Sequence, residues 1–306
     1  MEQQVFYEKL AALFPDRLQF ETLLAPYTTW RIGGPARALF QPQDTGECMT
    51  VLSLAAEYSI AVTYLGGGSN VLISDEGLPG LVLLTHGLQK IHWQGNRVRV
   101  GAGYRLPKLS WEAGQKGFSG LEFAVGIPGT LGGAVLMNAG AYDGCLSEVI
   151  ESVEVVTPDG EKRLLGKDEL TFGYRISSIK GSGLLITEVT LLLQPGDVDA
   201  ITRRMREFYE SRKQKQPLRY PNAGSVFKNP LNDSAGRLIE AAGAKGLTVG
   251  GAQVSTKHAN FIVNLGGATA QDVLTIIKEV QALVFEKFSL LLDTEIVLLG
   301  FDNNGR

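Results

Sequence analysis

Two glycine-rich stretches are the parts of this chain whose residue types and spacing most clearly suggest chemistry. They are Leu65–Asp75, with the sequence LGGGSNVLISD, and Gly126–Gly140, with the sequence GIPGTLGGAVLMNAG. Each follows or interrupts apolar sequence and leaves a run of backbone N–H groups with little side-chain cover, which is how proteins bind a diphosphate. Ser69 and Asn70 add a hydroxyl and an amide that suit a phosphate or a ribose. The sequence therefore predicts a site for a large phosphorylated cofactor.

The same glycines have a purely structural interpretation, because glycine marks turns and close packing more often than ligands. Neither stretch matches the dinucleotide fingerprint with its third glycine in register, and the chain contains no Gly-x-x-x-x-Gly-Lys-Ser/Thr motif. Position favours a ligand for the first stretch, since it directly follows an expected strand at 61–65.

The composition is that of a globular protein. The chain has 306 residues, 44% of them hydrophobic and 20% charged, which is sufficient for two or three domains and a large core. Its formal net charge of −3 gives no general attraction to nucleic acid or to an anionic membrane. Any basic binding site must therefore be local.

The cysteines and histidines predict neither a disulfide framework nor a metal site. Cys48 and Cys145 lie far apart in the sequence, which fits a reducing compartment. The three histidines lack the ligand spacing of known metal motifs, and we expect none of them to bind a metal; they are His86, His92 and His258.

The N-terminal sequence predicts neither export nor membrane insertion. It lacks the basic start and apolar core of a signal peptide, and the longest apolar stretch, Leu184–Leu193, is interrupted by Glu188. We therefore expect a cytoplasmic protein.

Hydrophobic periodicity indicates a chain that mixes helices and strands. A β-α-β unit is expected before the first glycine stretch, strands dominate from 80 to 195, and the pattern changes at residue 196, where a basic helical segment begins. A capping-box pattern at Thr269–Asp272 opens the last helix, and Thr157–Gly160 resembles a hairpin turn. The expected helices are near 3–14, 44–59, 106–116, 198–214, 234–242 and 270–287, and the expected strands are near 36–41, 61–65, 81–84, 97–100, 153–156 and 184–193.

Several separate motifs from Tyr27 to Gly300 together resemble the UDP-N-acetylenolpyruvoylglucosamine reductases of peptidoglycan synthesis. The motifs are TTWRIGG at 28–34, LGGGSN at 65–70, GIPGTLGG at 126–133, YR at 174–175, NAGSVFKNP at 222–230, GGAQ at 250–253 and TE at 294–295. This resemblance implies an α+β fold with a two-part FAD-binding region of the vanillyl-alcohol-oxidase (PCMH) type. The implied domains are FAD-binding subdomain 1 at 1–65, FAD-binding subdomain 2 at 66–196 and an α+β substrate domain at 197–306.

The resemblance also implies a reaction. Enzymes of this family use NADPH to reduce FAD and then reduce UDP-N-acetylglucosamine enolpyruvate to UDP-N-acetylmuramate. The family's catalytic residues match Arg175, Ser225 and Glu295 here. Arg175 would stabilise the anion that forms on hydride addition, Ser225 would protonate the carbanion carbon, and Glu295 would donate a hydrogen bond in its neutral form.

The binding residues implied by the resemblance fall into two groups. The substrate group is Lys215, Tyr220, Asn229 and His258, although His258 stands where other members carry glutamine. The short interval between Arg175 and Ser225 resembles the family type without the extra tyrosine loop over the uridine. The cofactor group is Thr29, Arg31, Gly66, Gly67, Gly68, Ser69, Asn70, Gly126, Ile127, Pro128, Gly132 and Gly133.

Alternative interpretations remain at this point. Taken singly, Arg175 suits a surface position, Ser225 a turn cap and Glu295 a solvated strand, and the basic run at 203–219 suits a wet helix face. A flavin oxidase of the same fold and a non-catalytic nucleotide-sugar binder are the rival functions. Because no histidine lies in either glycine stretch, we expect non-covalent FAD. Beyond FAD, NADPH and the UDP-sugar, the sequence gives no reason to expect an obligate protein partner.

Overall fold

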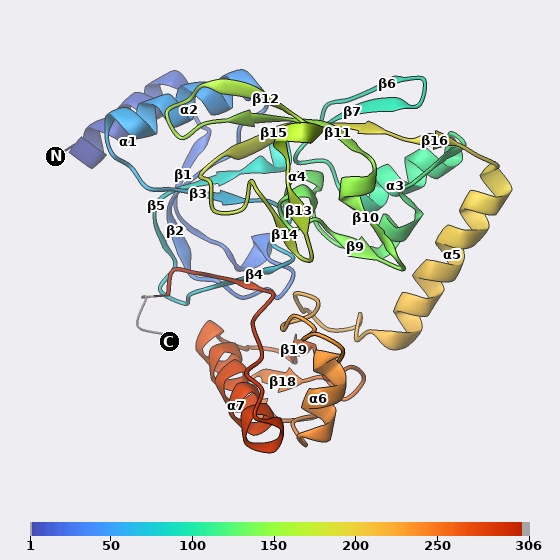
Figure 1. Ribbon diagram of the computed structural model, residues 1–306. Helices are drawn as coiled ribbons and strands as arrows, with labels where there is room; N and C mark the ends of the chain where they lie inside the picture. Colours follow the sequence, from blue (N-terminus) through green and yellow to red (C-terminus); the bar gives the residue numbers. More distant parts are fainter. Residues whose placement is uncertain (1, 302–306) are drawn as a thin grey trace. The chain divides into compact units, whose positions relative to one another are not determined.

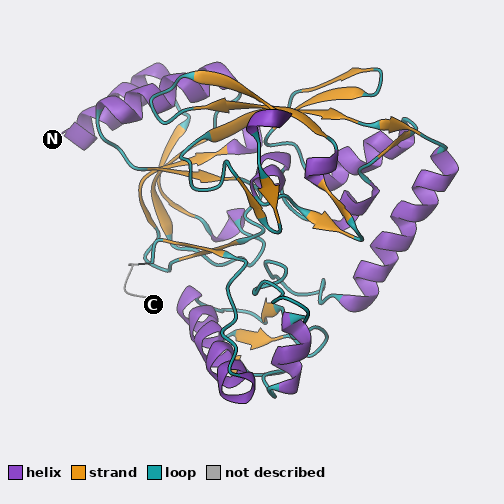
Figure 2. Ribbon diagram, viewed as in Figure 1, coloured by secondary structure: helices purple, strands orange, loops and turns teal. Residues whose placement is uncertain are grey.

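The computed structural model describes residues 2–301, and the mixture of helices and strands that the periodicity predicts is present (Figures 1 and 2). The chain forms two compact units that are each assembled from separate segments. Unit 1 comprises the chain up to Phe20, Ala38–Gly67 and Gly80–Arg212. Unit 2 comprises Glu21–Arg37, Gly68–Pro79 and the chain from Lys213 onward.

The helices are bounded as follows: α1 Glu2–Leu13, α2 Thr45–Glu57, α3 Leu106–Gln115, α4 Leu131–Leu136, α5 Val198–Lys215, α6 Ala235–Ala241 and α7 Ala270–Phe288, with short 3-10 helices η1 Ala25–Tyr27, η2 Thr85–Gly87, η3 Glu122–Gly126, η4 Leu146–Glu148 and η5 Lys167–Glu169. No helix within residues 2–301 is long and apolar enough to cross a bilayer.

The strands are β1 Leu18–Leu23, β2 Pro35–Phe40, β3 Val62–Leu65, β4 Val71–Ile73, β5 Leu78–Leu84, β6 Ile91–Gln94, β7 Arg97–Gly101, β8 Phe118–Ser119, β9 Gly140–Ala141, β10 Gly144–Cys145, β11 Ile150–Val156, β12 Lys162–Gly166, β13 Phe172–Gly173, β14 Ile176–Ser177, β15 Leu185–Leu192, β16 Gln194–Pro195, β17 Thr248–Val249, β18 Ala252–Val254, β19 Ile262–Asn264 and β20 Val297–Leu299.

The largest sheet of unit 1 has the strand order β12-β11-β15-β7-β6, and each neighbouring pair is antiparallel. Alternation along the strands sends valines into the core and charged residues to the opposite face: in β7, Val98 and Val100 are buried, whereas Arg97 and Arg99 are exposed. The predicted hairpin turn at 157–160 joins β11 to β12, with the Thr157 N–H donating to the Glu161 carbonyl at 2.8 Å.

The predicted strand-helix-strand unit before the first glycine stretch is present as β2, α2 and β3. In the sheet order β1-β2-β5-β3, strand β5 lies between β2 and β3, and β3 pairs with β5 in parallel. Asp44 caps α2 by accepting a hydrogen bond from the Glu47 N–H at 3.0 Å. Strand β3 then ends at Leu65, directly before the first glycine stretch.

Helix α5 begins where the sequence pattern changes, and its apolar stripe packs within unit 1 (Figure 1). Ile201 and Met205 are buried and form a small cluster with Val125, against which Trp111 and Phe208 pack. The stripe follows helical spacing, which is why the segment forms an amphipathic helix despite its many charges.

Unit 2 contains the antiparallel sheet β17-β18-β19 with helices α6 and α7, and the parallel pair β4–β20. The predicted capping box at the start of α7 is confirmed, since the Thr269 hydroxyl and the Asp272 carboxylate each accept the other's backbone N–H at 3.0 Å. Asp75 also accepts hydrogen bonds from the N–H groups of Ala270 and Gln271, at 2.8 and 3.1 Å. Two segments distant in sequence therefore meet at the start of this helix.

Candidate active site

The first glycine stretch packs tightly against the second within unit 1. A Cβ atom at Gly67 would lie 2.6 Å from the Cα of Gly129, and one at Gly66 would lie 2.6 Å from the Oγ1 of Thr130. Real Cβ atoms do not approach backbone atoms this closely, so Gly67 in particular admits no side chain without a backbone shift. The two stretches that the sequence singled out are thus brought together.

More of the second stretch is helical than its glycine content indicates. Residues 122–126 form η3 and Leu131–Leu136 form α4, and a Cβ at Gly132 would lie 2.8 Å from the Cβ of Ala102. Gly132 therefore has a packing role, as the structural interpretation of these glycines holds.

Polar groups at the junction of the two stretches lack partners in the protein. Within residues 2–301, the backbone N–H groups of Gly66, Gly67 and Gly129 donate no hydrogen bond. The hydroxyl of Thr130 is buried and also has no partner among the described residues. Because buried polar groups are nearly always satisfied, the Thr130 hydroxyl in particular requires a partner, and together with the three N–H groups it fits a bound group rich in hydrogen-bond acceptors, such as the diphosphate of FAD.

The remaining part of the first stretch belongs to unit 2, where it is tied to the TTWRIGG motif. Gly68 has φ +58°, and a Cβ there would overlap the carbonyl oxygen of Tyr27. The Thr29 N–H donates to the Gly68 carbonyl at 3.0 Å, and the Thr29 hydroxyl donates to the Asn222 carbonyl at 2.7 Å. Arg31, also with positive φ at +57°, is exposed. Thr29 thus holds two predicted binding motifs in register.

Ser225 and Glu295 lie on neighbouring segments of unit 2. The Glu295 N–H donates to the Val226 carbonyl at 2.7 Å, and Phe227 forms an antiparallel bridge with Thr294. Both predicted catalytic side chains are half-buried. The structure therefore brings together two residues that are far apart in the sequence.

Asn70 and Asn260 fix these two segments. The Asn70 side-chain amide donates to the Glu295 carbonyl at 3.2 Å, so this predicted cofactor residue also positions the backbone of Glu295. The Asn260 side chain accepts from the Phe227 N–H at 2.9 Å and donates to the Phe227 carbonyl at 2.8 Å. Our sequence analysis missed Asn260; the signal was a polar residue directly before the apolar run Phe261–Val263.

Arg175 occupies the tip of the hairpin β13–β14 in unit 1. Its φ of +59° lies in the left-handed region, which is unusual for a long side chain. The guanidinium carbon lies 5.1 Å from the centroid of the Tyr174 ring. The hairpin is held by the Asn138 amide, which donates to the Gly173 carbonyl at 3.1 Å, and by the Ser177 hydroxyl, which donates to the Leu136 carbonyl at 2.9 Å.

The predicted substrate residues all belong to unit 2 and differ in exposure. Lys215, at the end of α5, and Tyr220 are exposed. The Asn229 side-chain oxygen accepts from the Ala235 N–H at 3.0 Å, which leaves its NH₂ group as the part suited to a ligand. Burial lowers the pKa of His258, whose Nδ1 accepts from the Asn260 N–H at 3.3 Å. We therefore expect His258 to be neutral at pH 7.

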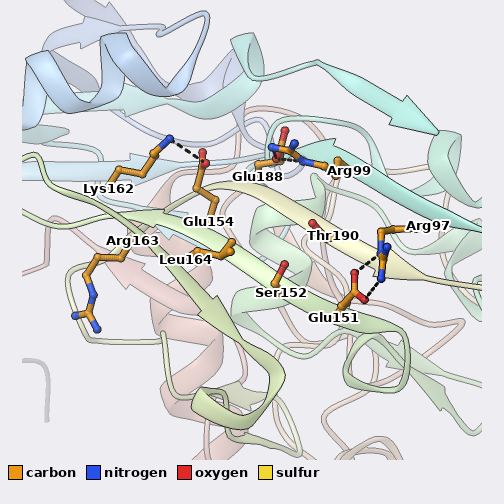
Figure 3. A pocket seen from close by; sticks show the side chains of 10 residues that line it. All are labelled: Arg97, Arg99, Glu151, Ser152, Glu154, Lys162, Arg163, Leu164, Glu188 and Thr190. Atoms are coloured by element: carbon orange, nitrogen blue, oxygen red, sulfur yellow. Dashed lines mark hydrogen bonds and ion pairs between the residues drawn. The ribbon is translucent and has the colours of Figure 1, made fainter. Parts of the chain in front are cut away.

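Figure 3 shows a hollow on the polar face of the five-stranded sheet, and none of the predicted site residues lines it. Its arginines are largely paired: Arg97 contacts Glu151 through two hydrogen bonds of 2.6 Å, and Arg99 contacts Glu188. Three of the four cations that line this hollow pair with its three carboxylates, so the hollow presents one net positive charge, on Arg163, which is little for a nucleotide diphosphate.

Known proteins match the chain over nearly its whole length. Family profiles match residues 36–165 as an FAD binding domain and residues 216–299 as the C-terminal domain of UDP-N-acetylenolpyruvoylglucosamine reductase. UDP-N-acetylenolpyruvoylglucosamine reductase 2 of Symbiobacterium thermophilum is 47% identical over 287 residues, which cover 94% of this chain and 93% of the relative. The enzyme of Moorella thermoacetica is 47% identical over 277 residues, covering 90% of this chain and 91% of the relative.

Solved structures agree. The UDP-N-acetylenolpyruvylglucosamine reductase of Thermus caldophilus has a TM-score of 0.79 and 42% identity, over 90% of this chain and 97% of that one. The glucose dehydrogenase Phl p 4.0202 has a TM-score of 0.51 at 13% identity over 63% of this chain and 44% of that one, a likeness of fold alone. The predicted FAD-binding fold is therefore confirmed. The chain belongs to the UDP-N-acetylenolpyruvoylglucosamine reductase family.

Proposed function

We propose that this protein is an FAD- and NADPH-dependent oxidoreductase that reduces UDP-N-acetylglucosamine enolpyruvate to UDP-N-acetylmuramate for peptidoglycan precursor synthesis. The observation that supports this most strongly is 47% identity to a reductase of that name across 94% of the chain. The rival functions, a flavin oxidase and a nucleotide-sugar binder, have no comparable full-length support.

FAD is the cofactor, and when bound it would supply hydride transfer from NADPH to the CH₂ carbon of the enolpyruvyl double bond. The residues that would hold it are the unpaired N–H groups of Gly66, Gly67 and Gly129 and the hydroxyl of Thr130, because these lack partners within the described chain. The close backbone contact between the two stretches leaves no room for a side chain at Gly67, so that a bound diphosphate could approach the backbone N–H groups.

Arg175 and Ser225 would manage the charge that hydride addition creates. A hydride at the CH₂ carbon places negative charge on the adjacent carbon and its carboxylate, and a fixed guanidinium such as that of Arg175 stabilises this anion. The Ser225 hydroxyl then donates its proton to the carbanion carbon, which completes addition of H⁻ and H⁺ across the double bond. A hydroxyl is a weak acid, but a carbanion is a strong enough base to accept its proton.

Glu295 would donate a hydrogen bond to the same anion while its carboxyl group is protonated. Its backbone is paired with Val226, next to Ser225, so that both side chains start from one small region of unit 2. Lys215 and the NH₂ group of Asn229 suit the diphosphate oxygens of the substrate, and Tyr220 and His258 suit its sugar and base. The division of the chain into 1–65, 66–196 and 197–306 belongs to this proposal, since it concerns ligands rather than packing.

A spectrum and one turnover assay test the proposal. The purified protein should be yellow, and acid precipitation should release all its flavin into solution because attachment is non-covalent. NADPH oxidation should depend strictly on the enolpyruvyl sugar nucleotide. A colourless protein would support the binder, whereas oxygen consumption with an alcohol or sugar, without NADPH, would support the oxidase.

A further inference from the structure

The segment that carries Ser225 is paired on one side by the segment that carries Glu295. Phe227 forms an antiparallel bridge with Thr294, and the hydrogen bonds of this bridge belong to flanking residues, such as the bond of 2.7 Å from the Glu295 N–H to the Val226 carbonyl. In a pair of this kind, the N–H and the carbonyl of the bridging residue point to the opposite side. Phe227 is only 1% exposed, so these two groups require partners in the protein.

Asn260 supplies both partners with one side chain. Its Oδ1 accepts from the Phe227 N–H at 2.9 Å, and its Nδ2 donates to the Phe227 carbonyl at 2.8 Å. Its backbone carbonyl accepts from the Val226 N–H at 2.9 Å, and the residue is only 4% exposed. A carboxylate has no donor and an aliphatic side chain has neither group, so this pairing requires an amide. The side chain thus takes the place of a neighbouring strand.

The segment that carries Ser225 bulges between two points at which it is paired. Before the serine, Asn222 forms an antiparallel bridge with Val263. Between this bridge and the Asn260 contacts, the serine segment has one residue more than its partner. Gly224, with φ +76°, lies in this bulge directly before Ser225. Bulges change the direction of a side chain and are common next to active sites, so the bonds at the end of the bulge affect the place of the serine.

We propose that Asn260 is a positioning residue for proton donation by Ser225, because its side-chain amide holds the end of the bulge in which the serine lies. This inference rests on the proposed function and acts on one step of it. In that step the Ser225 O–H bond breaks and a C–H bond forms at the carbanion carbon, and the serine oxygen later regains a proton from water. A hydroxyl is a weak acid and donates efficiently only from a close, fixed position.

The test is rapid-mixing absorbance of the holoenzyme with Asn260→Asp, which keeps the shape of the side chain and removes its NH₂ donor. We expect reoxidation of the reduced flavin by the enolpyruvyl sugar nucleotide to slow at least about tenfold. Bleaching of the flavin by NADPH should stay within about twofold of the parent, since that half needs no proton from Ser225. Asn260→Ser, which also lacks the amide, replaces the aspartate variant should that protein not fold.

Asn96→Asp is the matched control. The Asn96 side-chain amide of unit 1 donates to the Leu193 carbonyl at 2.7 Å, so this variant loses the same kind of donor from a partly buried bond. Both half-reactions of Asn96→Asp should keep the parent rates.

Combining the change with Ser225→Ala separates positioning from stability. A positioning residue acts through the hydroxyl that it places, so Asn260→Asp should slow reoxidation little in protein that already carries Ser225→Ala. Equal slowing in both backgrounds would overturn the proposal, as would equal slowing of both half-reactions or unchanged reoxidation in the single variant. A parent protein whose reduced flavin the enolpyruvyl substrate does not reoxidise would instead contradict the proposed function.

Discussion

Arg175 has a backbone conformation that its own side chain disfavours. Left-handed φ costs a non-glycine residue about 1–2 kcal/mol. Strain retained at a hairpin tip suggests that the guanidinium is kept for chemistry, which matches its proposed role as the stabiliser of the substrate anion.

Replacing Arg175 by glycine should therefore separate stability from activity. We expect the free energy of urea unfolding of Arg175→Gly to equal that of the parent or to exceed it by up to about 1 kcal/mol, because glycine accepts positive φ. Substrate-driven flavin reoxidation should slow by about 10²-fold or more. Arg163→Gly, at an exposed position of β12, is the matched control and should lower stability slightly without changing reoxidation. A large loss of stability in Arg175→Gly would show that the arginine is structural.

Gly67 tests the backbone contact between the two glycine stretches. Since a methyl group would lie 2.6 Å from the Cα of Gly129, Gly67→Ala should force the stretches apart and yield protein largely without flavin. Gly46→Ala, within α2 and with only the Asp44 side chain nearby, should keep the parent's flavin absorbance per mole of protein. A folded and fully yellow Gly67→Ala protein would contradict this placement of FAD.

At the scale of elements, strong periodicity and local capping made the long helices predictable. Helix α7 has its capping box as expected, and α5 follows its apolar stripe from Val198. The hairpins β9–β10 and β13–β14 were not predicted, because such short strands carry no period and are defined by what packs on them. Helix α4 was hidden by the glycines of its own sequence.

The site residues, like the elements, were predictable only where local sequence carries the signal. Local motifs and the family resemblance gave Ser225 and Glu295, whereas Asn260 acts through a distant partner, Phe227, that no local pattern reveals. Its contacts depend on the folded chain, so a single sequence offers only a polar residue at an apolar position as a signal.

The start of α7 provides a prediction at this scale. Asp75 accepts hydrogen bonds from two N–H groups at the helix N-terminus, where a carboxylate also interacts favourably with the helix dipole. Asp75→Ala should lower the free energy of urea unfolding by about 1–2 kcal/mol, and Asp75→Asn by less, since the amide keeps one acceptor. Equal stability of all three proteins would show that the Asp75 hydrogen bonds do not stabilise the start of α7.

At the scale of the whole molecule, unit 2 is assembled from segments that are distant in the sequence. Trp30 is fully buried in the same core as Phe227, and its indole N–H donates to the Ile262 carbonyl at 2.8 Å. Strand β20 pairs with β4, which precedes it by more than two hundred residues. The change in sequence pattern at residue 196 could not show this, because pattern reports only neighbours along the chain.

A fragment of residues 197–306 should therefore not fold by itself. It lacks Trp30, β4 and Asp75, and so it loses a buried aromatic side chain, a strand partner and a helix cap together. We expect its circular dichroism to change gradually in urea. A cooperative transition like that of the full chain would show that the C-terminal segment is an independent folding unit.

Rapid-mixing absorbance of Ser225→Ala tests the central claim most directly, because it separates the two halves of the proposed reaction. NADPH should bleach the flavin of this variant nearly as fast as in the parent, since that half needs no proton at the sugar ether. Reoxidation by the enolpyruvyl substrate should slow by roughly 10²–10⁴-fold, as expected for loss of a general acid. Ser234→Ala, which removes only the cap of α6, should leave both halves unchanged. Equal slowing of both halves in Ser225→Ala, or an unchanged second half, would contradict the account.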